Sequence, residues 1–162
     1  MRSRYTALLF TASILSVTGC DQPAPSVQDP PRAHAWQLTR DGVMAGNTSV
    51  AIPGWILAAE PYACPPELAV GPKGEAVVTS NVVSTLWRVD PETLAVTEHP
   101  LTLDADAGRD VGFSSLVYSP RHAAYFAVSA THGSLWRIDT QLQRAQKLGS
   151  TFSKENLPCA IG

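Results

Sequence analysis

The chain contains the same six-residue phrase twice, and this repetition constrains its fold more than any other feature. Residues 85–90 read TLWRVD, and residues 134–139 read SLWRID. Trp87 and Trp136 are 49 residues apart, while Pro72 and Pro120, in the turns that precede the two phrases, are 48 apart. Because two separate landmarks keep nearly the same spacing, the phrase belongs to a repeated structural unit.

Each unit is predicted to form four short antiparallel strands. The first unit has strands over residues 67–70, 75–80, 85–90 and 94–100, and the second over residues 115–118, 123–129, 134–139 and 142–148. The turns GPKG and DPET of the first unit carry proline at their second position, which presets the backbone angle of a tight turn. Asp90 is expected to accept a hydrogen bond from a backbone N–H that follows it.

The alternation within the phrase predicts a sheet that is covered on both sides. Trp87 and Val89 point to one face, and Leu86 and Arg88 point to the other, because side chains alternate along a strand. Two largely apolar faces each need a packed neighbour. We therefore expect Trp87 and its counterpart Trp136 in the core rather than on a ligand-binding surface.

The repeats resemble the blades of YVTN- and NHL-type β-propellers. The similarity rests on AVGPKGEAVV and the LWRVD phrase and covers about residues 65–150. It implies an all-β fold of two to three four-stranded, propeller-like antiparallel sheets, with repeats at about residues 65–103 and 113–150. It implies no particular function, because one fold serves many. Residues 49–59, SVAIPGWILAA, are expected to add the strands of a partial leading sheet.

Two units are too few for a closed propeller, which typically has four to eight blades. Three interpretations stay open at this point. The sheets form an open or incomplete propeller, copies of the chain associate to complete a ring, or the chain is the truncated relic of a longer propeller protein. An open stack exposes apolar faces, which favours self-association.

The first twenty residues predict export and lipid attachment. A basic start with Arg2 and Arg4 precedes an apolar run, and VTGC at residues 17–20 resembles the lipobox of bacterial lipoproteins. This resemblance implies a signal peptide over residues 1–19, lipidation of Cys20 and residence in the bacterial cell envelope, on the inner or the outer membrane. Residues 20–35 are rich in proline and predict a tether, which leaves residues 36–162 as the folded domain.

The other two cysteines are Cys64 and Cys159. Exported proteins fold in an oxidising compartment, where two cysteines usually pair. We predict a disulfide between them, and two buried free thiols are the alternative.

Asp104, Asp106 and Asp110 are weak candidates for a calcium site. Alternating aspartates with a glycine can wrap this ion with oxygen ligands. The glycine falls one position early for an EF-hand, no glutamate closes the loop, and Arg109 places a cation inside the cluster. A solvated loop is therefore expected, and we predict neither a bound metal nor another cofactor.

The remaining motifs argue against an enzyme. No nucleophile elbow, phosphate loop or dinucleotide fingerprint occurs, and no two histidines have metal-ligand spacing. The net charge is −2 with scattered basic residues, which disfavours nucleic-acid binding. We predict a non-enzymatic, membrane-anchored envelope lipoprotein that binds a protein or an envelope polymer. The alternatives are a metal-dependent hydrolase similar to propeller lactonases or gluconolactonases, and the truncated relic.

Overall fold

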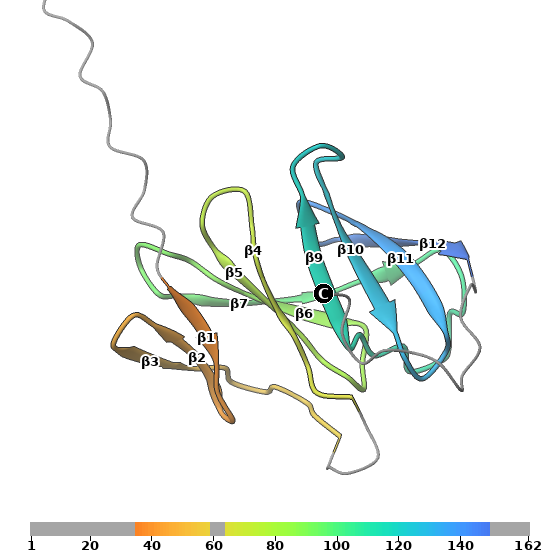
Figure 1. The fold of residues 1–162 in the computed structure, drawn as a ribbon. Helices are drawn as coiled ribbons and strands as arrows, with labels where there is room; N and C mark the ends of the chain where they lie inside the picture. Colours follow the sequence, from red (N-terminus) through yellow and green to blue (C-terminus); the bar gives the residue numbers. More distant parts are fainter. Residues whose placement is uncertain (1–34, 59–63, 150–162) are drawn as a thin grey trace, which may run out of the picture.

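The structure is a computed structural model that describes residues 35–58 and 64–149. These residues form three sheets and contain no helix, so none of them forms a helix long and apolar enough to cross a membrane. Figure 1 shows the three sheets following one another along the chain without closing into a ring. The expected all-β fold of propeller-like, largely antiparallel sheets is confirmed.

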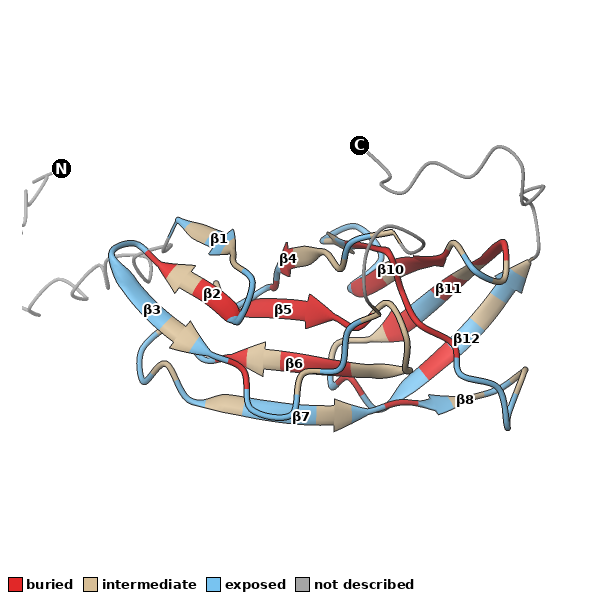
Figure 2. Cartoon of the chain, turned by 90° about the horizontal axis from the view of Figure 1, so that it is seen from below, coloured by how far each residue is buried: buried red, intermediate tan, exposed pale blue. Residues whose placement is uncertain are grey.

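The middle sheet is the first sequence unit, and its four strands pair in chain order as predicted. They are β4 (Leu68–Val70), β5 (Ala76–Thr79), β6 (Thr85–Val89) and β7 (Val96–Pro100). Within this sheet β5 is buried along its whole length, and β7 is the outer, more exposed strand (Figure 2). The burial of β5 follows from its continuous apolar run, because a strand that is covered on both faces has no polar side.

The second unit also forms the predicted four strands, and a fifth strand joins them. The four are β9 (Ser115–Ser119), β10 (Ala124–Ser129), β11 (Ser134–Asp139) and β12 (Arg144–Gly149). The short strand β8 (Thr102–Leu103) pairs in parallel with β12. Only the buried residue Leu101 separates β7 from β8, so one extended stretch of chain belongs to two sheets. The four strands predicted for this unit are confirmed, and the sheet has a fifth because β8 comes from the linker between the units.

The leading sheet lies earlier in the chain than we predicted. It consists of β1 (Trp36–Leu38), β2 (Gly42–Ala45) and β3 (Thr48–Ala51). Only residues 49–51 of the expected stretch are in a strand, because the chain turns directly afterwards. Pro53 has no N–H to donate, Gly54 adopts a left-handed φ of 70°, and the N–H of Trp55 bonds to the carbonyl of Ile52.

The two tryptophans of the repeated phrase occupy separate cores, each between two sheets. Trp87 and Val89 pack with Val43 in the core between the leading and middle sheets. Trp136 packs with Leu86 in the core between the middle sheet and the second repeat sheet. Each tryptophan thus faces the sheet that precedes its own. The core placement and the predicted alternation of side chains are both confirmed.

The aspartate that ends each phrase organises the turn after it. Asp90 Oδ1 accepts the backbone N–H groups of Glu92 at 3.0 Å and Thr93 at 2.8 Å, as predicted. These bonds, led by the one from Thr93, hold the pKa of Asp90 below its usual range. Asp139 caps the corresponding turn of the second unit by accepting the N–H of Arg144 at 2.7 Å.

Candidate functional site

A groove of about 640 Å³ opens where turns of the middle sheet meet turns of the second repeat sheet. Its volume lies within the range of small-ligand sites, roughly 300–1,000 Å³. We call it the inter-sheet groove. The middle sheet contributes Pro72, Lys73, Glu75, Arg88, Asp90 and Pro91. The second repeat sheet contributes Tyr118, Ala123, Thr140, Gln141 and Gln143.

Arg88 connects the two walls of this groove. It extends from the face of β6 that points toward the second repeat sheet, and its Nη2 donates to the carbonyl of Thr140 at 2.9 Å. Its Nε is buried and has no hydrogen-bond partner among the described residues. A buried donor without a partner is destabilising by about 1–3 kcal/mol, and such a group in a native structure requires an explanation.

The two carboxylates of the groove are already engaged inside the protein. Glu75 is 4% exposed, and its Oε2 accepts the backbone N–H of Lys73 at 2.7 Å. The hydroxyl of Tyr125 donates to Glu75 Oε1 at 3.4 Å. Asp90 is committed to its own turn, as described above. Neither carboxylate accepts a hydrogen bond from Arg88 Nε among the described residues.

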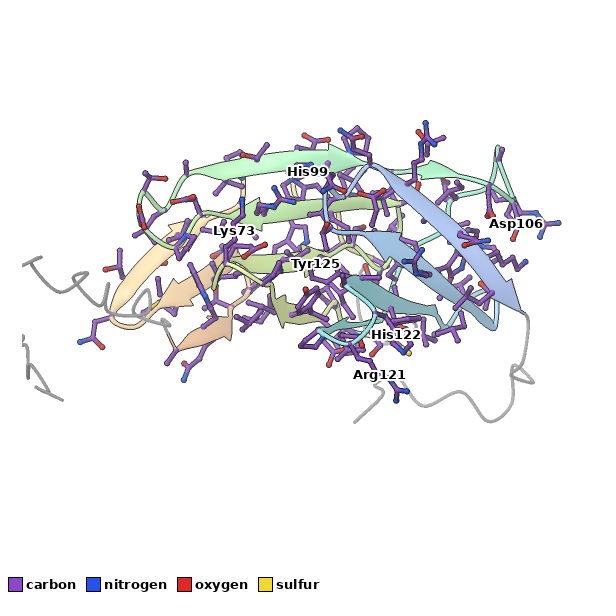
Figure 3. All side chains as sticks on the ribbon, turned by 90° about the horizontal axis from the view of Figure 1, so that it is seen from above. Lys73, His99, Asp106, Arg121, His122 and Tyr125 are labelled. Carbon is purple, nitrogen blue, oxygen red and sulfur yellow. The ribbon has the colours of Figure 1, made fainter. Side chains whose placement is uncertain are left out.

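Gly71 makes room for the pair of Glu75 and Tyr125. A Cβ at this position would lie 2.3 Å from the Tyr125 hydroxyl and 2.4 Å from the Glu75 carboxyl group. Burial, reinforced by the neighbouring charge of Glu75, raises the pKa of Tyr125 above its ordinary value. Tyr125 is therefore protonated, and its hydroxyl makes a long hydrogen bond to Glu75. Figure 3 shows Tyr125 near the centre of the molecule and Lys73 over the green strands of the middle sheet.

His99 lies on β7, opposite Leu86 and on the same face of the middle sheet as Arg88. Its Nε2 is buried without a hydrogen-bond partner among the described residues. Burial lowers the pKa of His99, the charge of Arg88 lowers it further, and Asp139 opposes the shift. His99 is thus preferentially neutral in the folded protein.

The shift of His99 predicts a pH dependence of stability. The unfolded chain binds a proton at His99 near pH 6.5, whereas the folded protein binds it only at lower pH. The free energy of unfolding therefore decreases as the pH falls below 6.5, because protonation favours the unfolded chain. In His99→Gln, the urea midpoint should change less between pH 7 and pH 5 than it does in the wild type. His122→Gln, on an exposed turn, is the control and should keep the wild-type slope. An unchanged slope in His99→Gln would contradict this assignment.

Of the predicted site residues, two cysteines lie outside the described residues. These are Cys20, the predicted lipidation site, and Cys159, the predicted partner of Cys64. Cys64 itself is half-buried, and its carbonyl accepts the side-chain N–H of Asn81 at 2.8 Å. Lipidation and the disulfide therefore both stay predictions.

The acidic cluster is used for contacts within the second repeat sheet. Asp104 Oδ1 accepts the backbone N–H of Lys147 at 2.9 Å, and the Lys147 ammonium donates to Asp106 at 2.6 Å. This hydrogen bond holds the pKa of Asp106 below its usual value. The backbone carbonyl of Asp110 lies 2.9 Å from His132 Nε2. Among the described residues, no three His, Cys, Asp or Glu side chains come together as a group that could hold a metal ion.

Sequence reasoning missed the inter-sheet groove. The sequence predicts strand positions for Glu75, Arg88 and Tyr125 but no site that brings them together. One signal was available, since the repeats place an arginine at the same position in both phrases. Only the packing shows that Arg88 faces another sheet, while Arg137 is exposed on the far side of its own.

Comparisons with known proteins add one distant likeness. No protein-family model matches the chain, and no curated protein matches its sequence. A crystal structure of selenomethionine-substituted virginiamycin B lyase from Staphylococcus aureus aligns with a TM-score of 0.48 at 14% sequence identity. The alignment covers 77% of this chain and 37% of the lyase, so the chain spans well under half of the length of that protein.

Proposed function

We propose that this chain is a lipid-anchored binding module of the bacterial cell envelope and that the inter-sheet groove holds a segment of its partner. One observation carries the choice of site. Arg88 lines the groove, and its bond to Thr140 fixes the guanidinium in the groove wall. A partner that brings acceptors into the groove can bond to the accessible N–H groups of this guanidinium.

The anchor is part of the same proposal. VTGC at residues 17–20 and the basic, apolar stretch before it support lipidation at Cys20. The proline-rich residues 20–35 support a tether that lets the domain reach a partner away from the lipid surface. Acyl chains contribute roughly 0.8 kcal/mol for each buried methylene, so a multiply acylated cysteine stays on the membrane.

Photo-crosslinking in intact cells tests this function. p-Benzoylphenylalanine incorporated at Gln141, an exposed residue of the groove rim, is expected to capture one defined envelope component. The same group at Ala51, exposed on β3 of the leading sheet, serves as the matched control and should capture much less of it. Recovery of the chain alone, or of equal products from both positions, would count against the proposal.

A Cys20→Ser variant in the same cells separates anchoring from binding. We expect it to lose incorporation of labelled palmitate and to leave the membrane fraction. The Gln141 crosslink should weaken accordingly, because the domain is no longer held at the envelope surface. A variant that keeps both label and membrane association would overturn the lipid anchor.

A further inference from the structure

We infer that the segment held in the inter-sheet groove is an uncharged carbohydrate; this inference rests on the proposed function and names its ligand class. The charges of the groove give the first argument. Two basic residues, Lys73 and Arg88, and two acidic residues, Glu75 and Asp90, line it. Because these charges cancel, the groove has no net electrostatic preference for a charged ligand.

The second argument is the kind of hydrogen bonding that the groove offers. Arg88 lines the groove with a guanidinium whose accessible N–H groups donate hydrogen bonds. Gln141 and Gln143, both exposed on the opposite wall, add side-chain amides that donate and accept. A hydroxyl group also donates and accepts, so a ligand with several neighbouring hydroxyls matches this mixed set. An aliphatic ligand would offer no acceptor to the Arg88 guanidinium.

The third argument is an aromatic side chain on the same wall. Tyr118 is half-buried, and its ring lies 5.1 Å from that of Tyr125, with a tilt of 55° between the planes. This contact fixes the ring at the edge of the groove. Aromatic side chains in ligand sites provide an apolar surface beside a few placed polar groups, and the C–H face of a sugar ring fits against such a surface.

The repeats supply a control within the molecule. Arg137 occupies in SLWRID the position that Arg88 occupies in TLWRVD. Arg137 is exposed and does not line the groove. Removing the guanidinium at each position therefore compares the same chemical change inside and outside the proposed site.

Titration calorimetry with the full chain tests the ligand class. The probes are triacetylchitotriose, which is uncharged, its cationic de-acetylated trimer, and anionic trigalacturonate. We expect the uncharged trimer to bind at least tenfold more tightly than either charged one. Arg88→Met should weaken its binding on the order of tenfold to a hundredfold, the range of a lost hydrogen bond from a charged donor. Arg137→Met should leave it unchanged.

A second variant guards against misfolding. Gln141→Ala changes only an exposed side chain and should weaken binding several-fold with an unaltered circular dichroism spectrum. The carbohydrate inference fails if the uncharged trimer does not bind, if a charged trimer binds more tightly, or if Arg88→Met and Arg137→Met behave alike. In that event, a partner crosslinked specifically from Gln141 would still support the proposed binding function. If no such partner is captured either, both the carbohydrate inference and the proposed function fail.

Discussion

Trp136→Ala is expected to lower the free energy of unfolding by about 3–5 kcal/mol, the usual range for removing a fully buried tryptophan. Trp136 is 0% exposed in the core between the middle and second repeat sheets. Its ring meets Phe113 edge-on at 6.2 Å, and its Nε1 donates to Ser134 Oγ at 2.8 Å. Alanine leaves a cavity and an unpaired hydroxyl. Urea unfolding of the full chain, followed by far-ultraviolet circular dichroism, measures the loss.

Val117→Ala is the control for this result. Val117 lies in the same sheet, but it is 47% exposed. Substitutions at such exposed positions usually change stability by about 0.5 kcal/mol or less. If Trp136→Ala lowers the free energy of unfolding by less than about 1 kcal/mol, the packing of the two sheets does not depend on this core.

Gly112→Ala is expected to destabilise the fold by about 3 kcal/mol, at the upper end of the range for overpacking. A Cβ at Gly112 would lie 2.1 Å from the carbonyl carbon of Asn81 and 2.3 Å from the backbone nitrogen of Val82. Backbone atoms cannot rotate away as a side chain does. The two segments lie close enough here for the N–H of Phe113 to donate to the carbonyl of Ser80 at 2.7 Å. The methyl group therefore separates the two segments and breaks this bond.

Thermal unfolding measures the effect of Gly112→Ala, with Ser114→Ala as its control. Ser114 is 5% exposed and lies in the same segment, but its hydroxyl makes only a long bond of 3.3 Å to Val128. Ser114→Ala should therefore lower the free energy of unfolding by about 0.5–1.5 kcal/mol. If Gly112→Ala and Ser114→Ala have the same midpoint of thermal unfolding, the close packing at Gly112 is not important for stability.

The strands of the repeats could be predicted because their signals are local. Alternation in the two phrases placed Trp87 and Trp136 in the core, and proline and aspartate marked the turns. The strand β8 escaped prediction because it contains two residues, and its partner β12 lies about forty positions further along the chain. The leading sheet lies before the predicted residues 49–59, because a turn at Pro53 and Gly54 interrupts that apolar stretch.

The candidate site could not be predicted from the same signals. Both phrases contain arginine in an equivalent strand position, so the sequence treats Arg88 and Arg137 alike. Their difference comes from which face of which sheet has a neighbour, and this is a property of the stack. The unpaired Nε of Arg88 is visible only in the packed structure, where no described acceptor bonds to it. Local sequence carries no information about which acceptors surround a buried side chain.

The stretch of chain shared by β7 and β8 has a consequence for how the molecule opens. β7 pairs with β6 in the middle sheet, β8 pairs with β12 in the second repeat sheet, and only Leu101 lies between them. Separating either sheet breaks hydrogen bonds in the other, because both sheets include this stretch of chain. The two sheets therefore form one cooperative unfolding unit. The leading sheet has no such shared strand among the described residues, and its amide protons should exchange with solvent at a lower free energy of opening.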